Sequence, residues 1–281
     1  MPATPATHVY KTATGCEIGA DVYGPAAGTS AGPAPAIVWI HGGCLMYGSC
    51  KGIHPRQLEL YTRAGYAIVS IDYRLAPESL LPDIVEDLRD AFAWVRGPGA
   101  QEHGIDPERI AVVGHSAGGY LAQMSGVCVA PRPRAIVSFY GYGDIVGDWY
   151  AKPDPFYCKQ PAVSEEESGR LTKGPVISEP YEGRGKDKFY LYCRQHGFWQ
   201  QEVGGHDPPT LLLHGDRDTD VPYEQSVLMA EELARHGVEH ELVTMLGRGH
   251  GFDGKMDDPV VRDAFDKTLR FLDSRTKRKA Q

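Results

Sequence analysis

The sequence predicts an α/β fold in which a mostly parallel central sheet is flanked by helices. Short, almost continuously apolar segments alternate along the chain with longer segments whose apolar residues recur at helical spacing. This alternation is typical of parallel strands buried between helices. The chain of 281 residues, 42% of them hydrophobic, is long enough to bury one core of the size common in α/β domains. We therefore expect residues 1–281 to form a single domain.

The first half of the chain supplies the opening elements of this fold. A hairpin is expected around Gly15, followed by a surface loop rich in proline, glycine and alanine. Apolar strands and helices then alternate, and Pro82 suits the first turn of its helix. The expected strands cover 9–11, 16–23, 36–40 and 66–71, the helices cover 56–63 and 82–95, and the loop covers 24–35.

The second half contains a long interruption. Residues 140–207 are rich in proline, glycine and aromatic residues, and a stretch of this length inside a compact domain is not expected to be structureless. We interpret it as an inserted cap with short helices. The expected strands around it cover 109–113, 135–139, 210–213 and 240–246, and the helices cover 120–127, 223–236 and 260–272.

Ser116 is the first candidate functional residue. It lies in a Gly-x-Ser-x-Gly motif between an apolar strand and a helix. A serine on such a sharp turn has a strained backbone, requires small neighbours and projects its hydroxyl away from the sheet. Glycine-flanked serines also occur in ordinary turns. A nucleophilic role therefore requires a base, a carboxylate and oxyanion donors elsewhere in the chain.

His250 is the candidate base. It lies in a glycine-rich loop directly after the last strand, from which an imidazole can reach over the sheet edge towards the serine. His41 and His214 also end strands, but each is followed directly by a turn with another expected role. The turn after His41 is the candidate source of oxyanion donors, and the turn after His214 contains the candidate carboxylates. His206 is a weaker rival at the boundary of the cap.

The candidate carboxylates Asp216, Asp218 and Asp220 lie in the turn after the strand over 210–213. Aspartate is common in turns and helix caps, so all three are also compatible with a structural role. Asp144, just past the preceding strand, is an outside candidate.

The turn after the strand over 36–40 is the candidate source of oxyanion donors. Glycines in His41-Gly42-Gly43-Cys44 let backbone N–H groups approach a ligand closely. With the N–H of Ala117, the residue after the serine, they would form an oxyanion hole. A Gly-Gly turn is often only a turn, but here it coincides with the other three elements.

These motifs together resemble the α/β-hydrolase superfamily, and more narrowly its hormone-sensitive-lipase-like, feruloyl-esterase-like and arylformamidase-like serine carboxylesterases. The order serine, aspartate, histidine is also that of the α/β-hydrolase fold. The resemblance implies Asp218 as the acid, which leaves Asp216 and Asp220 as its solvent-facing or helix-capping companions. It also implies Gly43 and Cys44 as oxyanion donors and the segment 72–78 as a scaffold loop. The matching segments are 41–43, 72–78, 114–119, 214–218, 221–222 and 249–252.

The resemblance implies a serine carboxylic-ester hydrolase that uses a triad of Ser116, His250 and Asp218 and an acyl-enzyme intermediate. Its substrate would be a small or medium ester, and the aromatic residues of the cap favour an aromatic one. A lactonase, arylformamidase or amidase would use the same triad, and a non-catalytic ligand-binding protein on this fold is a remote alternative. One departure is that Cys44 stands where the family usually has a third glycine, which narrows the loop.

The composition speaks against several other classes of protein. A net charge of -8 is unsuited to binding a nucleic-acid backbone, and no apolar run approaches the length of a membrane span. The first residues lack a signal-peptide pattern, and the six cysteines lack metal-ligand spacing and are expected to be reduced thiols. We therefore expect a cytoplasmic protein without metal or other cofactor, whose partner is a small-molecule ester or related carbonyl compound. The oligomeric state stays open, with a homodimer as one candidate.

Overall fold

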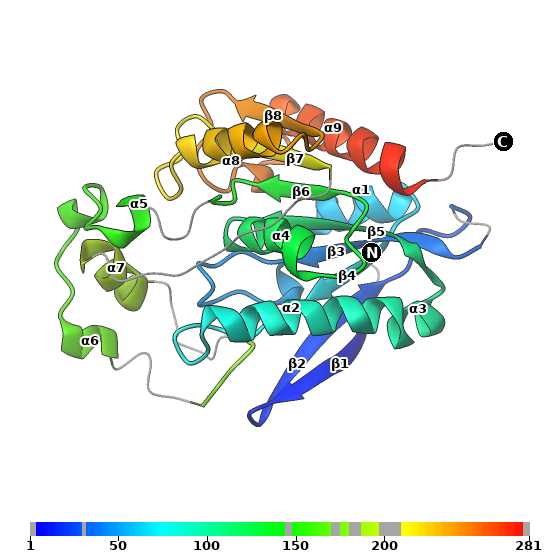
Figure 1. The fold of residues 1–281 in the computed structure, drawn as a ribbon, viewed down its shortest axis with the longest axis horizontal. Helices are drawn as coiled ribbons and strands as arrows, with labels where there is room; N and C mark the ends of the chain where they lie inside the picture. The colour runs from blue at the N-terminus through cyan, green and yellow to red at the C-terminus, as the bar shows by residue number, and fades with distance from the viewer. Residues whose placement is uncertain are drawn as a thin grey trace.

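A single mostly parallel sheet forms the centre of the molecule. The computed structural model describes residues 4–29, 32–143, 148–169, 175–179, 187–196 and 209–277. In these ranges eight strands lie in the order β1-β2-β4-β3-β5-β6-β7-β8 (Figure 1). β1, β2 and β4 pair antiparallel, and all pairs from β4 through β3 to β8 are parallel, which confirms the predicted sheet. The strands are β1 (Ala6–Ala13), β2 (Cys16–Tyr23), β3 (Ala34–Ile40), β4 (Ala67–Ile71), β5 (Ile105–His115), β6 (Ile136–Phe139), β7 (Thr210–Gly215) and β8 (His240–Met245).

Helices cover both faces of the sheet because successive strand residues point to opposite sides. In β3, Val38 and Ile40 belong to an apolar cluster with residues of α2 and α4, whereas Ile37 and Trp39 belong to a second cluster with α1 and α9. Every residue of β3 is therefore buried, as its continuous apolar sequence predicts. The helices beside the sheet are α1 (Pro55–Arg63), α2 (Leu81–Arg96), α3 (Pro98–His103), α4 (Ala117–Cys128), α8 (Glu224–Arg235) and α9 (Pro259–Thr276), and short 3-10 turns are η1 (Cys50–Gly52) and η3 (Phe252–Gly254).

The helix expected over 82–95 is confirmed as α2, and local chemistry explains its limits. Ile84, Leu88 and Val95 recur at helical spacing and are buried. Its first turn contains a proline, whose missing N–H would have no helical partner there, and the Asp83 carboxylate accepts the N–H of Leu80 at 3.0 Å. The sequence did not predict α3, because a helix of six residues is too short to show a periodic pattern.

The helical segments Asp148–Ala151, Glu165–Gly169 and Asp187–His196 lie together at one end of the molecule, away from the helices that cover the sheet (Figure 1). Residues 175–179 instead lie against β2, where Ser178 donates its hydroxyl to the Glu17 carbonyl at 2.8 Å. Arg194 joins two of these parts: its guanidinium lies over the rings of Tyr150 and Tyr157, at 4.7 and 5.0 Å, and forms an ion pair with Asp154. Its side chain is only 2% exposed, so it is a packing element of this segment. The short elements here are α5 (Asp148–Ala151), η2 (Tyr157–Lys159), α6 (Glu165–Gly169) and α7 (Asp187–His196).

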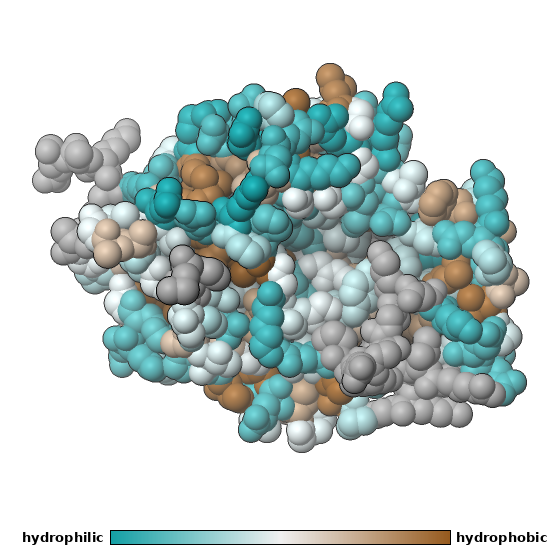
Figure 2. All heavy atoms as spheres, turned by 180° about the vertical axis from the view of Figure 1, so that it is seen from behind, coloured by the Kyte–Doolittle hydropathy of each residue, from teal (hydrophilic) through white to brown (hydrophobic). Residues whose placement is uncertain are grey.

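The surface carries mostly polar side chains. On the face drawn in Figure 2, hydrophilic residues predominate and hydrophobic ones form separate small groups. Scattered apolar side chains of this kind are normal on a protein surface. Among the helices in the described ranges, none has the length and hydropathy needed to cross a membrane.

Candidate active site

Ser116 occupies a strained turn between β5 and α4. Its φ is 53° and its ψ is -120°, a conformation that few side chains adopt. Its N–H donates to the carbonyl of Phe139 at 2.9 Å, which ties the turn to β6. A Cβ at Gly118 would lie 2.2 Å from the carbonyl oxygen of Ile40, and a Cβ at Gly114 would lie 1.9 Å from that of Gly118. Only glycine permits this close approach of α4 to the sheet.

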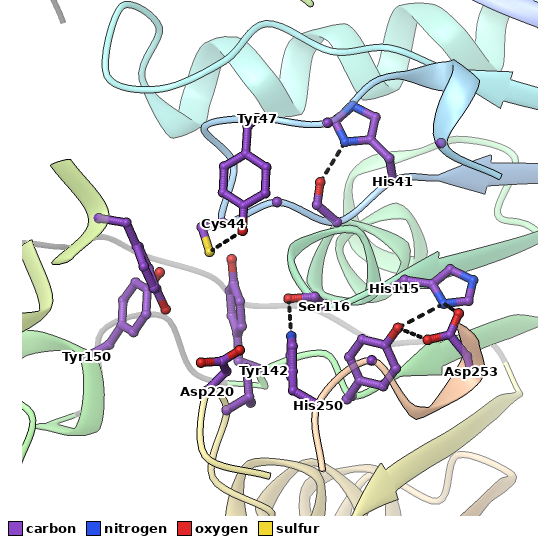
Figure 3. Close-up of a pocket in the computed structure, with 18 of the residues that line it drawn as sticks. His41, Cys44, Tyr47, His115, Ser116, Tyr142, Tyr150, Asp220, His250 and Asp253 are labelled. Carbon is purple, nitrogen blue, oxygen red and sulfur yellow. Dashed lines mark hydrogen bonds and ion pairs between the residues drawn. The ribbon is translucent and has the colours of Figure 1, made fainter. Parts of the chain in front are cut away.

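The structure brings together the three residues that the sequence nominated for a triad. His250 Nε2 lies 2.9 Å from Ser116 Oγ, and His250 Nδ1 lies 2.7 Å from Asp218 Oδ2. Figure 3 shows the imidazole of His250 facing the serine. Ser116 follows β5, Asp218 follows β7 and His250 follows β8. They meet because the carboxyl ends of parallel strands lie at the same edge of a sheet, where α/β folds place their sites.

Asp218 is held as an ionised hydrogen-bond acceptor. Its side chain is fully buried, and its Oδ1 accepts the N–H groups of Asp220 and Val221, each at 2.9 Å. Burial raises its pKa, but the hydrogen bonds from His214 and His250 outweigh burial and hold the pKa of Asp218 well below its ordinary value. His214 Nε2 lies 3.3 Å from Asp218 Oδ2 and 3.0 Å from the Val221 carbonyl oxygen. His214 therefore supports the turn that carries the acid.

The loop after β3 presents the candidate oxyanion donors. Burial lowers the pKa of His41 to about 4, so its imidazole is neutral at pH 7, and its Nδ1–H donates to the Gly42 carbonyl at 2.7 Å. The C=O and N–H of a trans peptide point in opposite directions, so this bond turns the N–H of Gly43 away from His41. Gly43 and Cys44 line the cavity described below. Ala117 begins α4, where N–H groups have no acceptor within the helix.

The other candidate carboxylates have different surroundings. Asp216 is exposed and accepts the N–H of Gly247 at 2.6 Å. Asp220 was expected to face solvent or to cap a helix, but it is half-buried, lines the cavity and accepts a hydrogen bond from the hydroxyl of Tyr157. The reason is that η2 packs against this turn, a contact over 63 residues of sequence that no local pattern reveals. Asp144, like His206, lies outside the described residues.

His115 and Asp253 form a second polar pair beside the serine, which the sequence analysis missed. Asp253 Oδ2 lies 3.2 Å from His115 Nδ1 and accepts a hydrogen bond from Gln57 Nε2 at 2.7 Å. Tyr140 donates its hydroxyl to Asp253, and its ring packs edge-on against His250 with centroids 4.6 Å apart. Burial raises the pKa of Asp253, but His115 and the hydrogen bonds lower it to well below its ordinary value. The pair thus fixes the ring that supports the candidate base, and its one sequence signal is an acidic residue in the loop of His250.

Ser116 and His250 open into a cavity of about 530 Å³. Its walls come from the loop after β3, from turns at the carboxyl ends of other strands and from the segment 140–207. Aromatic side chains predominate, as in sites that bind apolar or aromatic groups beside a few polar ones. The aromatic residues of the lining are Trp39, Tyr47, Tyr140, Tyr142, Tyr150, Phe156, Tyr157 and Tyr190.

Side chains that could share a metal ion gather away from this cavity. In the described part of the chain, two groups bring ligand atoms within 4.8 Å of one another: His8 with Glu102 and His103, and Cys50 with Asp72 and Glu179. Neither group contributes to the cavity lining.

Fold and site together define a hydrolase of the α/β class. A family model described as alpha/beta hydrolase fold matches residues 37–254, and the chain belongs to this family. The matched range begins in β3 and extends beyond His250 to the end of η3. The resemblance drawn from the sequence motifs, and the fold class with it, are thereby confirmed.

Solved structures share this fold over nearly the whole chain. A Staphylococcus aureus protein of unknown function has a TM-score of 0.77 at 23% identity, covering 92% of this chain and 95% of that one. A thermophilic esterase from Thermogutta terrifontis has a TM-score of 0.69 at 24% identity, covering 99% of this chain and 95% of its own. The structure of Thermogutta terrifontis esterase 2 phosphonylated by sarin aligns at 26% identity with a TM-score of 0.69, covering 99% of this chain and 98% of that one.

Curated relatives of known name are much longer proteins. A non-reducing polyketide synthase from Preussia isomera is 28% identical over 94% of this chain, and one from Stereocaulon alpinum is 29% identical over 88%. The chain spans only 14% and 12% of the lengths of these two synthases. The similarity therefore concerns one segment of each synthase.

Proposed function

We propose that the chain is a serine carboxylesterase that cleaves small or medium esters, with a preference for aromatic groups. The observation that carries the proposal is the alignment of Ser116 Oγ, His250 and Asp218 through contacts of 2.9 and 2.7 Å at an aromatic cavity. This is the arrangement in which a base and its orienting carboxylate activate a serine. The esterase relatives support an ester over the lactone, formamide or amide that the same triad could attack.

The acylation half-reaction follows from the direction of the hydrogen bonds. His250 Nδ1–H donates to the ionised Asp218, which leaves Nε2 free to accept the proton of Ser116. As that proton moves to Nε2, Ser116 Oγ bonds to the carbonyl carbon of the ester. When the tetrahedral intermediate collapses, the bond to the leaving alcohol breaks and the alcohol oxygen takes the proton from His250.

Deacylation repeats these steps with water. A water molecule gives a proton to His250 Nε2 and bonds through its oxygen to the acyl carbon, and Ser116 leaves with the proton as the acid is released. In both halves the N–H groups of Gly43, Cys44 and Ala117 would stabilise the oxyanion. A single donor of this kind typically contributes about 3 kcal/mol to lowering the barrier.

Residues 140–207 are proposed as the cap of a single domain that spans residues 1–281. Phe156, Tyr157 and Tyr190 from this segment line the cavity, so they would contact the substrate beyond its reacting carbonyl. The similarity to polyketide synthase segments favours a polyketide acyl group as a second candidate for the acyl part. Comparing one acyl group as an aryl ester, a thioester and an amide would rank these bond types.

The proposal is tested with p-nitrophenyl acetate and a Ser116→Ala variant. We expect kcat to fall about 10⁶-fold, to the rate without a nucleophile. Ser125→Ala is the matched control, because Ser125 lies on the same helix, bonds to the carbonyl of Ala122 and does not line the cavity. This control should keep its activity.

A chemical label gives an independent readout of the same nucleophile. Paraoxon phosphorylates Thermogutta terrifontis esterase 2, and here it should add one diethylphosphoryl group, found by peptide mass spectrometry on Ser116. Equal turnover by wild type and Ser116→Ala, or labelling of another residue, would show that the serine is not the nucleophile.

A further inference from the structure

We propose that Asp220 makes the cavity selective for esters that carry a cationic ammonium group. This inference rests on the proposed esterase function, because it names the substrate class of the same site. Asp220 lies two residues beyond Asp218, is half-buried and lines the cavity. Figure 3 shows its carboxylate beside Tyr142, on the opposite side of Ser116 from His115.

The backbone holds Asp220 next to the triad. Its N–H donates to Asp218 Oδ1 at 2.9 Å, and the following residue, Val221, is buried. One carboxylate oxygen, Oδ1, accepts the hydroxyl of Tyr157. Within the described ranges no Lys or Arg forms an ion pair with Asp220, so no cationic side chain there neutralises its charge. Its position is fixed while its charge stays available to a ligand.

The rest of the described lining contains no Lys or Arg. Its histidines are held by other groups: His41 by the Gly42 carbonyl, His115 by Asp253 and His250 by Asp218. The other carboxylate in the lining belongs to Asp253, which is occupied by His115, Tyr140 and Gln57. In this part of the chain Asp220 is therefore the group that sets the sign of the field met by a substrate arm.

The buried cation Arg194 is closed off from the cavity. Its side chain is 2% exposed and lies over the rings of Tyr150 and Tyr157, which themselves line the cavity. Its charge is balanced by the ion pair with Asp154. Arg194 thus stiffens the aromatic wall and leaves the negative sign of the cavity unchanged.

Aromatic rings complete a site that suits an alkylammonium group. Tyr142 and Tyr150 stack with centroids 5.7 Å apart, and both line the cavity. Tyr47 forms another wall of the cavity. Burial, and after it Cys44 and the charge of Asp220, raise the pKa of the Tyr47 hydroxyl far above its ordinary value. The field of Asp220 therefore extends to that wall. Ring faces attract a cation, and a partly desolvated carboxylate adds Coulombic attraction. An ammonium arm would gain both, whereas a carboxylate arm would be repelled.

Matched substrates separate charge from shape. Acetylcholine, the acetic ester of choline, is compared with 3,3-dimethylbutyl acetate, in which carbon replaces the ammonium nitrogen of the alcohol arm. On the acyl side, p-nitrophenyl 4-(trimethylammonio)butanoate is compared with p-nitrophenyl 5,5-dimethylhexanoate. We expect wild type to prefer the cation about tenfold in kcat/KM in at least one pair, which corresponds to about 1.4 kcal/mol.

Two variants separate the charge of Asp220 from its contact with the cap. Asp220→Asn removes the charge but keeps an oxygen that can accept the hydroxyl of Tyr157. Tyr157→Phe removes that hydrogen bond but keeps the carboxylate. The cation preference should fall to about one in Asp220→Asn and should persist in Tyr157→Phe. Each preference is a ratio within one variant, so a general change in activity cancels.

A measurement on wild type alone covers the case of a poorly folding variant. Choline should inhibit p-nitrophenyl acetate hydrolysis at a lower concentration than 3,3-dimethylbutan-1-ol, and added NaCl should narrow the gap. Preferences near one in both pairs, or a preference that survives Asp220→Asn, would overturn the inference while leaving the esterase function standing. Absence of p-nitrophenyl acetate turnover in wild type would overturn both.

Discussion

Replacing Asp218 with asparagine tests the hydrogen-bond directions on which the mechanism depends. The asparagine Oδ1 can still accept the N–H groups of Asp220 and Val221, which Asp218 accepts at 2.9 Å. Its NH2 group, however, would face His250 Nδ1, which lies 2.7 Å from the present carboxylate oxygen. An amide donor at this position requires Nδ1 to accept, so the ring proton moves to Nε2 and points at Ser116. The imidazole can then no longer remove the serine proton.

The expected loss follows from this change of tautomer and from the missing negative charge. Carboxylate-to-amide exchange in a serine triad lowers kcat about 10⁴-fold, or about 5.4 kcal/mol in the barrier. The same NH2 group would also face His214 Nε2, 3.3 Å from Asp218 Oδ2, where it meets a second donor. An unsatisfied buried group of this kind costs about 1–3 kcal/mol of stability. Activity should therefore fall much further than folding.

Initial rates with p-nitrophenyl acetate, together with urea unfolding, separate the two effects. Asp216→Asn is the matched control, because this exposed aspartate in the same turn bonds to the N–H of Gly247 and should leave kcat within about twofold. Asp144→Asn is measured in parallel. Full activity of Asp218→Asn, or a larger loss in Asp216→Asn or Asp144→Asn, would refute the assignment of the acid.

Two further predictions concern stability. Burial raises the pKa of Asp72 from 3.8 to about 6, so the folded state binds the extra proton and the free energy of unfolding falls as the pH rises through this window. The free energy of unfolding of Asp72→Asn should not show this fall. In urea titrations the difference in free energy of unfolding between the variant and wild type should therefore change by about 3 kcal/mol in favour of the variant from pH 3 to pH 7. A difference that stays constant over this range would contradict the pKa shift. A Cβ at Gly118 would lie 2.2 Å from the Ile40 carbonyl oxygen, so Gly118→Ala should lose at least about 2 kcal/mol. Gly24→Ala is the control, because its Cβ would meet no atom within 4 Å, and it should change stability by less than about 0.5 kcal/mol. A loss in Gly118→Ala no larger than that in Gly24→Ala would show that the turn at Ser116 tolerates a side chain.

The sequence predicts the fold well where burial dictates the residue pattern. β3, β4 and β7 are buried on both faces, so each reads as an apolar run bounded by turn residues. Limits of elements are harder to predict. Helix α4 begins at Ala117, three residues before its expected start, because the strained turn at Ser116 places Gly118 and Gly119 inside the first helical turn despite their low helix propensity. Such exceptions arise where close backbone contact, and not propensity, decides the conformation.

The same distinction applies to the candidate site: residues in local motifs could be predicted, whereas contacts between distant segments could not. Ser116, Asp218 and His250 each follow a recognisable strand and sit in short motifs, so their meeting at one sheet edge could be predicted. The contact between His115 and Asp253 spans 138 positions and depends on how the loop of His250 folds back over β5. Apart from the presence of an acidic residue in the loop of His250, no local signal points to this contact. Long-range polar pairs of this kind become visible only with the fold.

The loop after β3 keeps its shape although Cys44 stands where the family usually has a third glycine. Cys44 and Leu45 have φ angles of 54° and 63°, in the left-handed region that costs a non-glycine residue about 1–2 kcal/mol. Leu45 is 1% exposed, and its carbonyl accepts the N–H of Ala76 at 2.8 Å, so packing and hydrogen bonding hold the strained backbone. The Gly43 carbonyl accepts the N–H groups of Met46 and Tyr47, which closes the turn. The loop therefore keeps its turn without a third glycine and places the Cys44 thiol 3.6 Å from the Tyr47 hydroxyl at the cavity, where a glycine would leave space for a larger substrate.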